Sequence, residues 1–248
     1  VAHTSDELLV LLPPSEGKAS GGARGLSGGT FSRSLARPRA EVRRALASVL
    51  NDPSRSARVL GVQGALLEDA RAATRRLVGG RPPLLPAWQR YTGVVWEHLE
   101  ASSLTIEQRR RVLVPSGLYG ITTADDPIAD YRLKLSVSLG GIGSLARFWR
   151  PSLTRALRPV VAGRSVVVML PKEHAAAIDH TALAAVCELV EVRFVDRGGS
   201  RSVGHAAKAV KGVAARVLLE GGLSELETLR SAGWTARRSS VGIDVVAP

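Results

Sequence analysis

Three short apolar segments of this chain each end at a proline, and they constrain the fold more than any other feature. They read LLVLLPP, RVLVPSG and SVVVMLP, and begin at Leu8, Arg111 and Ser165. Their length, their Leu and Val content and the proline stop are typical of buried strands. Segments with helical spacing follow them, so the pattern predicts a mixed α/β domain with a central sheet flanked by helices. In such sheets, ligands gather beyond the carboxyl ends of the strands.

Several other elements follow from periodicity and from start and stop signals. Residues 39–50 and 64–78 show helical spacing with arginines on the outer face. TGVVWEHL predicts a helix capped by Thr92, and HAAKAVKGVAARVLLEG predicts a helix that stops at Gly221. We further expect LSELETLRSAGW to be helical and TARRSSVGIDVVAP to form a terminal hairpin.

The domain organisation predicted from the sequence is simple. The 248 residues contain no internal repeat and no linker, so residues 1–248 are interpreted as one domain. Residues 19–30 are rich in Gly and Ser, and we predict a loop there that is mobile unless a ligand orders it.

Composition narrows the class of protein and of partner. The 34 Lys and Arg residues exceed the 22 Asp and Glu residues, giving a net charge of +12 that favours an anionic partner. Only 4% of residues are aromatic, which disfavours stacking of single-stranded bases. A single Cys187 excludes an internal disulfide framework and any Cys-rich metal site.

A membrane segment and a secretory signal are not expected. The longest apolar runs are far shorter than the roughly 20 residues of a membrane helix. The first residues, VAHTSDE, lack a basic stretch followed by an apolar one. We therefore expect a cytoplasmic protein that does not bind membranes.

The loop PPSEGK, after the first predicted strand, is the first candidate site. It is not a phosphate-binding P-loop, because Ala19 stands where that motif has a hydroxyl. Ser15 and Lys18 could still hold an anion, and Glu16 could act as a base or neutralise Lys18. On spacing alone, an ordinary turn at the end of a strand is the favoured interpretation.

A second candidate lies in PSGLYGITTADDPIADYRLKLS. In an extended segment, Tyr131 and Leu133 would face one way while Arg132 and Lys134 face the other. Two cations on one face suit a sulfate, phosphate or carboxylate. The alternative, at even weight, is a solvated basic edge strand that discourages aggregation.

The third candidate lies in GHAAKAVKGVAARVLLE, where helical spacing places His205, Lys208 and Lys211 on one face. A lysine crowded by another cation can have a lowered pKa and serve as a base. A solvated basic stripe is the competing and slightly favoured interpretation. His174 and His180 have no helical metal spacing and are interpreted as non-ligands. From the residues alone we expect an anion-handling α/β protein.

Taken together and in order, these motifs resemble the peroxide stress protein (YaaA) family. The resemblance extends from Leu8 to about Val246 and rests on LPPSEGK, YTGVVWEHL, VPSGLYGITTADDPIADYRLKL, LARFWRPSL, HAAKAVKGVAARVLLE and LRSAGW. It implies one compact α/β domain with a positively charged cleft. It also implies a link to peroxide stress, to limiting iron damage and to DNA binding. The positions that match the family's cleft motifs are Ser15, Glu16, Lys18, Tyr91, Thr92, Gly93, Gly117, Tyr119, Tyr131, Arg132, Lys208, Lys211 and Gly212.

Departures from the family pattern lie at the rim of the implied cleft. After the VVVML strand, the family's polar segment ending in Tyr is replaced by PKEHAAAI. His205 is followed by Ala206 and Ala207 in place of Phe and Asn. LGVQGALLEDA has one residue too many for the turn of a helix-hairpin-helix motif, which weakens the DNA hypothesis. Such changes are expected of a scaffold adapted to another ligand, and drift is the alternative.

The leading hypothesis is an enzyme that acts on an anionic small molecule, in specialised metabolism, without metal or organic cofactor. Its anion-binding residues would be Ser15, Lys18, Tyr91, Thr92, Tyr131, Arg132, Lys134 and Lys211. Its catalytic residues would be Glu16, Tyr119, His205 and Lys208. The expected chemistry is base-assisted elimination or intramolecular displacement, because cations stabilise a departing anion. The alternatives are a DNA-binding stress protein that limits iron damage, and a non-catalytic subunit that needs a partner chain.

Overall fold

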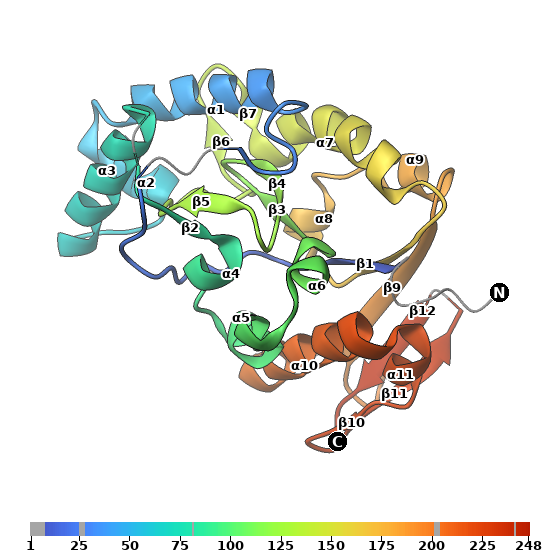
Figure 1. Ribbon diagram of the computed structural model, residues 1–248. Helices are drawn as coiled ribbons and strands as arrows, with labels where there is room; N and C mark the ends of the chain where they lie inside the picture. Colours follow the sequence, from blue (N-terminus) through green and yellow to red (C-terminus); the bar gives the residue numbers. More distant parts are fainter. Residues whose placement is uncertain (1–7, 25–27, 81, 201–203, 241) are drawn as a thin grey trace.

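An eight-stranded mixed sheet forms the centre of the protein, in the order β10-β11-β12-β9-β8-β1-β3-β4 (Figure 1). The computed structural model describes residues 8–24, 28–80, 82–200, 204–240 and 242–248. The strands are β1 Leu8–Leu11, β3 Val112–Ser116, β4 Gly120–Thr123, β8 Ser165–Val168, β9 Glu188–Val195, β10 Arg230–Ser231, β11 Trp234–Ser239 and β12 Gly242–Val246. This single domain with a mixed sheet confirms the predicted fold class.

The three proline-ended segments occupy neighbouring positions in this sheet. β1 pairs in parallel with β3 on one side and with β8 on the other. All residues of β1, β3 and β8 are buried, because helices cover both faces of the sheet. The chain passes from β1 to β3 on one side and later returns to β8 on the other. The carboxyl ends of β1 and β8 thus flank a topological switch point, where α/β sheets place their ligands.

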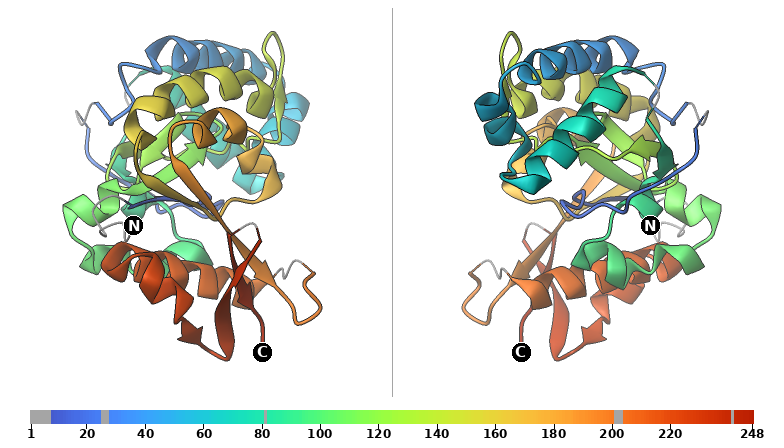
Figure 2. Two further views of the ribbon diagram at one scale, coloured as in Figure 1. Left: turned by 90° about the vertical axis from the view of Figure 1, so that its right-hand side faces the viewer. Right: turned by 90° about the vertical axis from the view of Figure 1, so that its left-hand side faces the viewer.

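Two layers of helices enclose the sheet. α1 Ala36–Val49 and α7 Leu145–Val161 lie on one side, and α5 Val94–Leu99 and α10 His205–Gly221 lie on the other (Figures 1 and 2). The remaining helices are α2 Pro53–Leu60, α3 Ala65–Val78, α4 Ala87–Arg90, η2 Ala101–Ser103, α6 Ile106–Arg110, α8 Lys172–Ala175, α9 His180–Ala184 and α11 Leu223–Glu227. Two small two-stranded antiparallel sheets complete the fold: β2 Leu84–Pro86 with β5 Pro127–Ala129, and β6 Ser138–Leu139 with β7 Gly143–Ser144.

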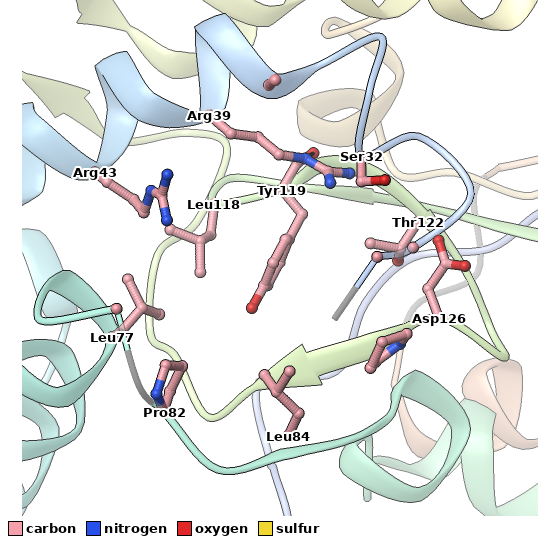
Figure 3. A pocket seen from close by; sticks show the side chains of 15 residues that line it. Ser32, Arg39, Arg43, Leu77, Pro82, Leu84, Leu118, Tyr119, Thr122 and Asp126 are labelled. Atoms are coloured by element: carbon pink, nitrogen blue, oxygen red, sulfur yellow. Dashed lines mark hydrogen bonds between the residues drawn. The ribbon is translucent and has the colours of Figure 1, made fainter. Parts of the chain in front are cut away.

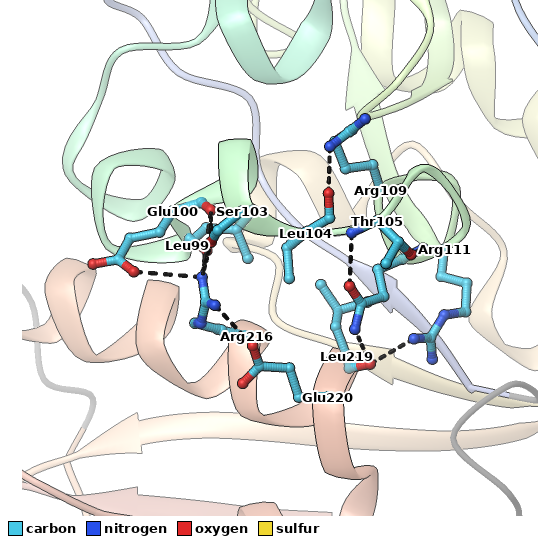
Figure 4. Close-up of polar contacts among 11 residues, drawn as sticks. Leu99, Glu100, Ser103, Leu104, Thr105, Arg109, Arg111, Arg216, Leu219 and Glu220 are labelled. Atoms are coloured by element: carbon cyan, nitrogen blue, oxygen red, sulfur yellow. Dashed lines mark hydrogen bonds and ion pairs between the residues drawn. The ribbon is translucent and has the colours of Figure 1, made fainter.

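Polar contacts to α5, η2 and α6 fix the carboxyl-terminal half of α10 (Figure 4). The Arg216 guanidinium donates to the carbonyls of Leu99 and Glu100 and to the Ser103 hydroxyl. It also pairs with the carboxylates of Glu100 at 3.4 Å and of Glu220 at 2.8 Å. These contacts hold α10 at a defined position, and its amino-terminal half extends toward the edge where β1 and β8 end.

Three local predictions were wrong. Gly93, not Thr92, is the N-cap of α5, and no side-chain hydrogen bond caps that helix. The segment LSELETLRSAGW is helical only over α11, because Arg230 and Ser231 form β10 and pair with β11. Residues 130–134 belong to no strand, so the alternative interpretation of this segment as a basic edge strand is also wrong. The predicted burial alternation is confirmed, with Tyr131 and Leu133 buried.

The Gly- and Ser-rich loop is described over residues 19–24 and 28–30. Ala23 pairs with Leu84 through two backbone hydrogen bonds, and Thr30 donates from its backbone N–H and its hydroxyl to Asp126. The predicted mobility of 19–30 falls partly on residues 25–27, which lie outside the described residues. In the described ranges no helix is long and apolar enough to cross a membrane.

Candidate functional site: a basic cleft at the carboxyl ends of the central strands

A cavity of about 820 Å³ opens at the carboxyl ends of β1, β3 and β8. That volume lies in the range of sites that enclose small organic ligands. The loop after β1, the turn after β3, the extended segment after β5, the loop after β8 and α10 all line it. Its charged and hydroxyl-bearing lining residues are Ser15, Glu16, Lys18, Tyr131, Arg132, Lys134, Ser136, Glu173, His174, Lys208 and Lys211. The three sequence motifs with candidate anion-binding residues therefore meet in one cavity.

Lys18 forms the floor of the cleft. Its Nζ atom donates to the Ser15 carbonyl at 2.7 Å and lies 4.5 Å from the centre of the Tyr131 ring. Burial lowers the pKa of Lys18 to about 8, although Asp130 acts in the opposite direction. Lys18 is thus a cation at neutral pH that has already lost most of its water. An anion entering the cleft would gain more from such a charge than from a solvated lysine.

The Tyr131 ring next to Lys18 belongs to a row of three contacting hydroxyl groups. The Tyr131 hydroxyl accepts a hydrogen bond from Ser116 Oγ at 2.8 Å and lies 3.0 Å from the Tyr91 hydroxyl. Burial raises the pKa of Tyr131 to about 12 and that of Tyr91 further still, so both hydroxyls keep their protons. Tyr91 contributes to the site by positioning Tyr131, since it does not itself line the cleft.

Gly93 is required by the close approach of two sequence motifs. A Cβ atom on Gly93 would lie 2.4 Å from the Ser15 hydroxyl oxygen, closer than any real contact. The backbone N–H of Thr92 donates to the Gly17 carbonyl at 3.2 Å, and that of Ala19 donates to Arg90. The YTG motif therefore holds the PPSEGK loop in place, and Ser15 is buried by that contact. The Thr92 side chain is exposed outside the cleft.

Among the described residues, the rim of the cleft carries one cation that is ion-paired and two that are not. Lys134 is paired with Glu16 at 2.7 Å, and both side chains are mostly exposed. That hydrogen bond lowers the pKa of Glu16, with Lys18 and Lys208 acting in the same direction. Arg132 and Lys208, in contrast, make no ion pair within the residues that the structure describes. Because neither cation is engaged in an ion pair there, these two are the rim groups most available to an anion.

Lys211 and His174 close the opposite wall. Lys211 Nζ donates to the Met169 carbonyl at 3.0 Å and lies 5.1 Å from the centre of the Phe194 ring. His174 was interpreted from the sequence as a non-ligand, yet it lines the cleft beside Glu173. Histidine spacing along the chain could not indicate this position. The rule that ligands gather where parallel strands end could have, because His174 follows β8.

Tyr119 lies in a second, smaller cavity of about 320 Å³ rather than in the cleft (Figure 3). Its ring packs edge-on against Tyr131, with 5.6 Å between the ring centres, and so separates the two cavities. Its hydroxyl accepts the Ala129 N–H at 2.9 Å, and its carbonyl accepts from Arg39 at 2.8 Å. A catalytic role for Tyr119 stays a prediction, and its contacts are those of a wall residue.

His205 also lies outside the lining of the cleft. It is the first residue of α10 and is exposed, whereas Lys208 and Lys211, further along the helix, both line the cavity. The predicted shared face of the helix therefore contributes two of its three members. Over the described residues, no three His, Cys, Asp or Glu side chains are grouped so that they could hold a metal ion.

Comparison with known proteins connects the cleft to a family. Residues 8–237 match the family model described as peroxide stress protein YaaA. A UPF0246 protein of Streptomyces coelicolor is 34% identical over 241 residues, covering 92% of this chain and 91% of the relative. A UPF0246 protein of Corynebacterium glutamicum is 32% identical over 229 residues, with 89% and 87% covered. The matches span every element that lines the cleft.

Proposed function

We propose, from the premise that this chain belongs to the peroxide stress protein YaaA family, that its basic cleft binds an anionic small molecule and acts on it as an enzyme. The observation that carries the proposal is the combination of a desolvated cation, Lys18, with Arg132 and Lys208, which make no ion pair within the described residues. Lys18 is already held by the Ser15 carbonyl and the Tyr131 ring, so it needs little reorganisation to bind an oxyanion.

The proposed reaction is loss of a sulfate- or phosphate-type leaving group, by elimination or by intramolecular displacement. In either reaction the carbon–oxygen bond breaks and its electron pair leaves with the anion. Lys18 and Arg132 would stabilise that charge as it develops. A base removes a proton from a neighbouring C–H or N–H group, and the freed electron pair forms the new C=C or C–N bond. Glu16 is a weak candidate for this base, because Lys134 lowers its pKa.

Binding of sulfate tests the first half of the proposal. Sulfate is titrated into the full chain at low ionic strength, with equal ionic strength of chloride as the control, and binding is followed by calorimetry. Arg132→Ala should weaken sulfate binding by about tenfold, as expected for one charge-assisted contact. The matched control is Arg43→Ala, which removes an equal charge from the smaller cavity and should leave sulfate affinity within about twofold. Equal losses in both variants, or no saturable binding, would contradict the proposal.

Release of the leaving group tests the second half. O-phospho-L-serine and 2-aminoethyl sulfate each carry a leaving anion beside a removable proton. We expect at least one such amino-bearing ester to lose its anion faster with the protein than without it. Arg132→Ala should abolish that acceleration. If a broad panel of sulfate and phosphate esters remains intact while sulfate binds, the cleft is a binding site and the enzymatic part is wrong.

Binding of duplex DNA is the second candidate function, and a surface feature favours it. α1, α2, α3 and the turn before α1 carry exposed arginines near one end of the cleft, where Leu60 and Gly61 line it. These exposed residues are Arg33, Arg37, Arg43, Arg44, Arg58, Arg75 and Arg76. DNA affinity that falls steeply with salt, and that Arg43→Ala with Arg44→Ala weakens, would support this function. Absence of binding at low salt would exclude it.

A further inference from the structure

His174 is a mostly buried imidazole in the wall of the cleft, and it has no role in the reaction proposed above. It lies on α8, the single helical turn that follows β8, and its side chain is 16% exposed. The segment that carries it, PKEHAAAI, begins where β8 ends, beside the end of β1. His174 therefore faces the same cavity as the PPSEGK loop.

One ring nitrogen of His174 lacks a hydrogen bond. Nδ1 is buried and makes none within the described residues. The nearest carboxylate oxygen, Glu173 Oε1, lies 3.6 Å from it, just beyond hydrogen-bond distance. Most buried polar atoms in proteins have a hydrogen-bond partner, so an unpartnered Nδ1 that faces a cleft is available to one. A small movement of Glu173 would complete a carboxylate–imidazole pair, and such contacts often tighten only when a ligand binds.

The charges around His174 come from three elements. Glu173 lies on the same helix, Lys211 approaches from α10 and Glu16 from the loop after β1. Burial is the largest influence and lowers the pKa of His174, and Lys211 lowers it further, while Glu173 and Glu16 act in the opposite direction. The imidazole is therefore neutral at neutral pH and keeps a lone pair that can accept a proton. An anion bound in the cleft would favour the protonated form.

We propose that His174 is the proton acceptor of the cleft and that Glu173 is the positioning residue that orients its ring. The proposal rests on the proposed function, since it supplies the base for that reaction. With the Nδ1 proton directed at Glu173, Nε2 receives the proton from the substrate's C–H or N–H group. The electron pair of that bond forms the new C=C or C–N bond, and the sulfate or phosphate departs toward the cations. The Glu173 carboxylate then stabilises the imidazolium.

Titration of the histidine rings by NMR tests this assignment with sulfate as the probe. Sulfate keeps its charge across the titrated range, so only the protein titrates. The chain has five histidines, and the His174 signals are assigned as those missing from His174→Gln. We expect saturating sulfate to raise the pKa of His174 by about half a unit or more, because a bound anion favours the imidazolium. The chemical shifts of His205, which lies outside the cleft, should respond much less to sulfate.

Two variants separate positioning from folding. Glu173→Gln should lower the pKa of His174 and change the ¹⁵N shifts that report its tautomer, while sulfate affinity stays within about twofold or improves. Glu225→Gln is the control for loss of an exposed carboxylate elsewhere and should leave the His174 signals unchanged. His174→Gln should abolish turnover of any ester that the wild-type protein cleaves, with its melting temperature within a few degrees.

The failures of the two proposals are distinguishable. If sulfate binds and depends on Arg132, but the His174 signals ignore both sulfate and Glu173→Gln, then His174 is not the base and the anion site stands. If His174→Gln retains turnover, the same conclusion follows. If sulfate does not bind to the wild-type protein, the anion site itself is wrong and the base assignment is overturned with it.

Discussion

Two cavities in the described residues are both lined by basic and tyrosine side chains, and Arg39 in one differs from Arg132 in the other in how it is partnered. In the smaller cavity, Arg39 donates to the carbonyls of Tyr119 and Ile121, and Asp126 accepts hydrogen bonds from Thr30 and Thr123. In the larger cleft, Arg132 and Lys208 have no such partners among the described residues. Whether a charged side chain already has a partner within the protein therefore says more about its availability to a ligand than the number of charges in the cavity.

The largest effect on stability should come from a substitution in the smaller cavity. Asp126→Ala removes a buried carboxylate that accepts three hydrogen bonds, two of them from Thr30 and one from the Thr123 backbone. We expect the free energy of unfolding to fall by about 4 kcal/mol, because the buried donors lose their partner. Sulfate affinity should stay within about twofold where the variant is folded. Urea unfolding and calorimetry measure the two effects, and a large loss of sulfate affinity would remove the distinction between the cavities.

Lys18 should give the next largest effect on the free energy of unfolding, and this effect depends on pH. Its folded-state pKa of about 8 lies below the ordinary value of 10.5. Between pH 8 and 10.5 the unfolded chain binds more protons, so the free energy of unfolding should rise with pH by about 3 kcal/mol across this window. Lys18→Met should lack that rise when urea unfolding is measured at pH 7 and at pH 10.

The same titration should appear in binding. Sulfate affinity of the wild-type protein should fall as pH rises through about 8, because Lys18 loses its charge there. In Lys18→Met, affinity should be lower at pH 7 and should change less between pH 7 and pH 9. An unchanged pH dependence in the variant would show that Lys18 is not part of the anion site.

A smaller effect is expected at Gly212, which matches a cleft motif of the family but is buried outside the cleft lining. A Cβ atom there would lie 2.4 Å from the Val95 carbonyl oxygen, between α10 and α5. Gly212→Ala should lower the free energy of unfolding by about 2 kcal/mol through overpacking. Sulfate affinity should change only insofar as α10 shifts Lys208 and Lys211. No change in stability would contradict the packing role.

The smallest effect should come from the exposed pair at the rim. Glu16→Gln breaks a largely solvent-exposed ion pair with Lys134, so stability should change by less than about 0.5 kcal/mol. Removing this negative charge should nevertheless increase sulfate affinity by about threefold, because Lys134 becomes available to the anion. Decreased affinity would indicate that Glu16 contacts the ligand through a shared proton.

Much of the frame could be predicted from the sequence because its signals are local. The proline-ended strands and the long amphipathic helices carry their periodicity within a few residues, and all of them are present. The prediction did not include α2, although Asp52 caps it and Pro53 begins it. Its eight residues, two turns of helix, were too short for periodicity to indicate.

The parts of the site that were missed depend on contacts between distant segments. The roles of Tyr91 and Ser116 depend on hydroxyl contacts to Tyr131 that arise only after folding. His174 meets Lys211 and Glu16 only because β8 and β1 are neighbours in the sheet. Spacing along the chain could not show either relation. The sequence could show which residues follow the strands, and many of those residues line the cleft.

Crystals soaked in selenate test the central claim most directly, since selenium locates a sulfate-like anion by its anomalous scattering. We expect an anomalous selenium peak inside the cleft, within contact distance of Arg132 and with Lys18 or Lys208 as a second partner. Arg132→Ala crystals soaked in the same way should lose that peak. Selenate bound only at the exposed arginines of α1 to α3, with none in the cleft, would contradict the proposal that the cleft is an anion site.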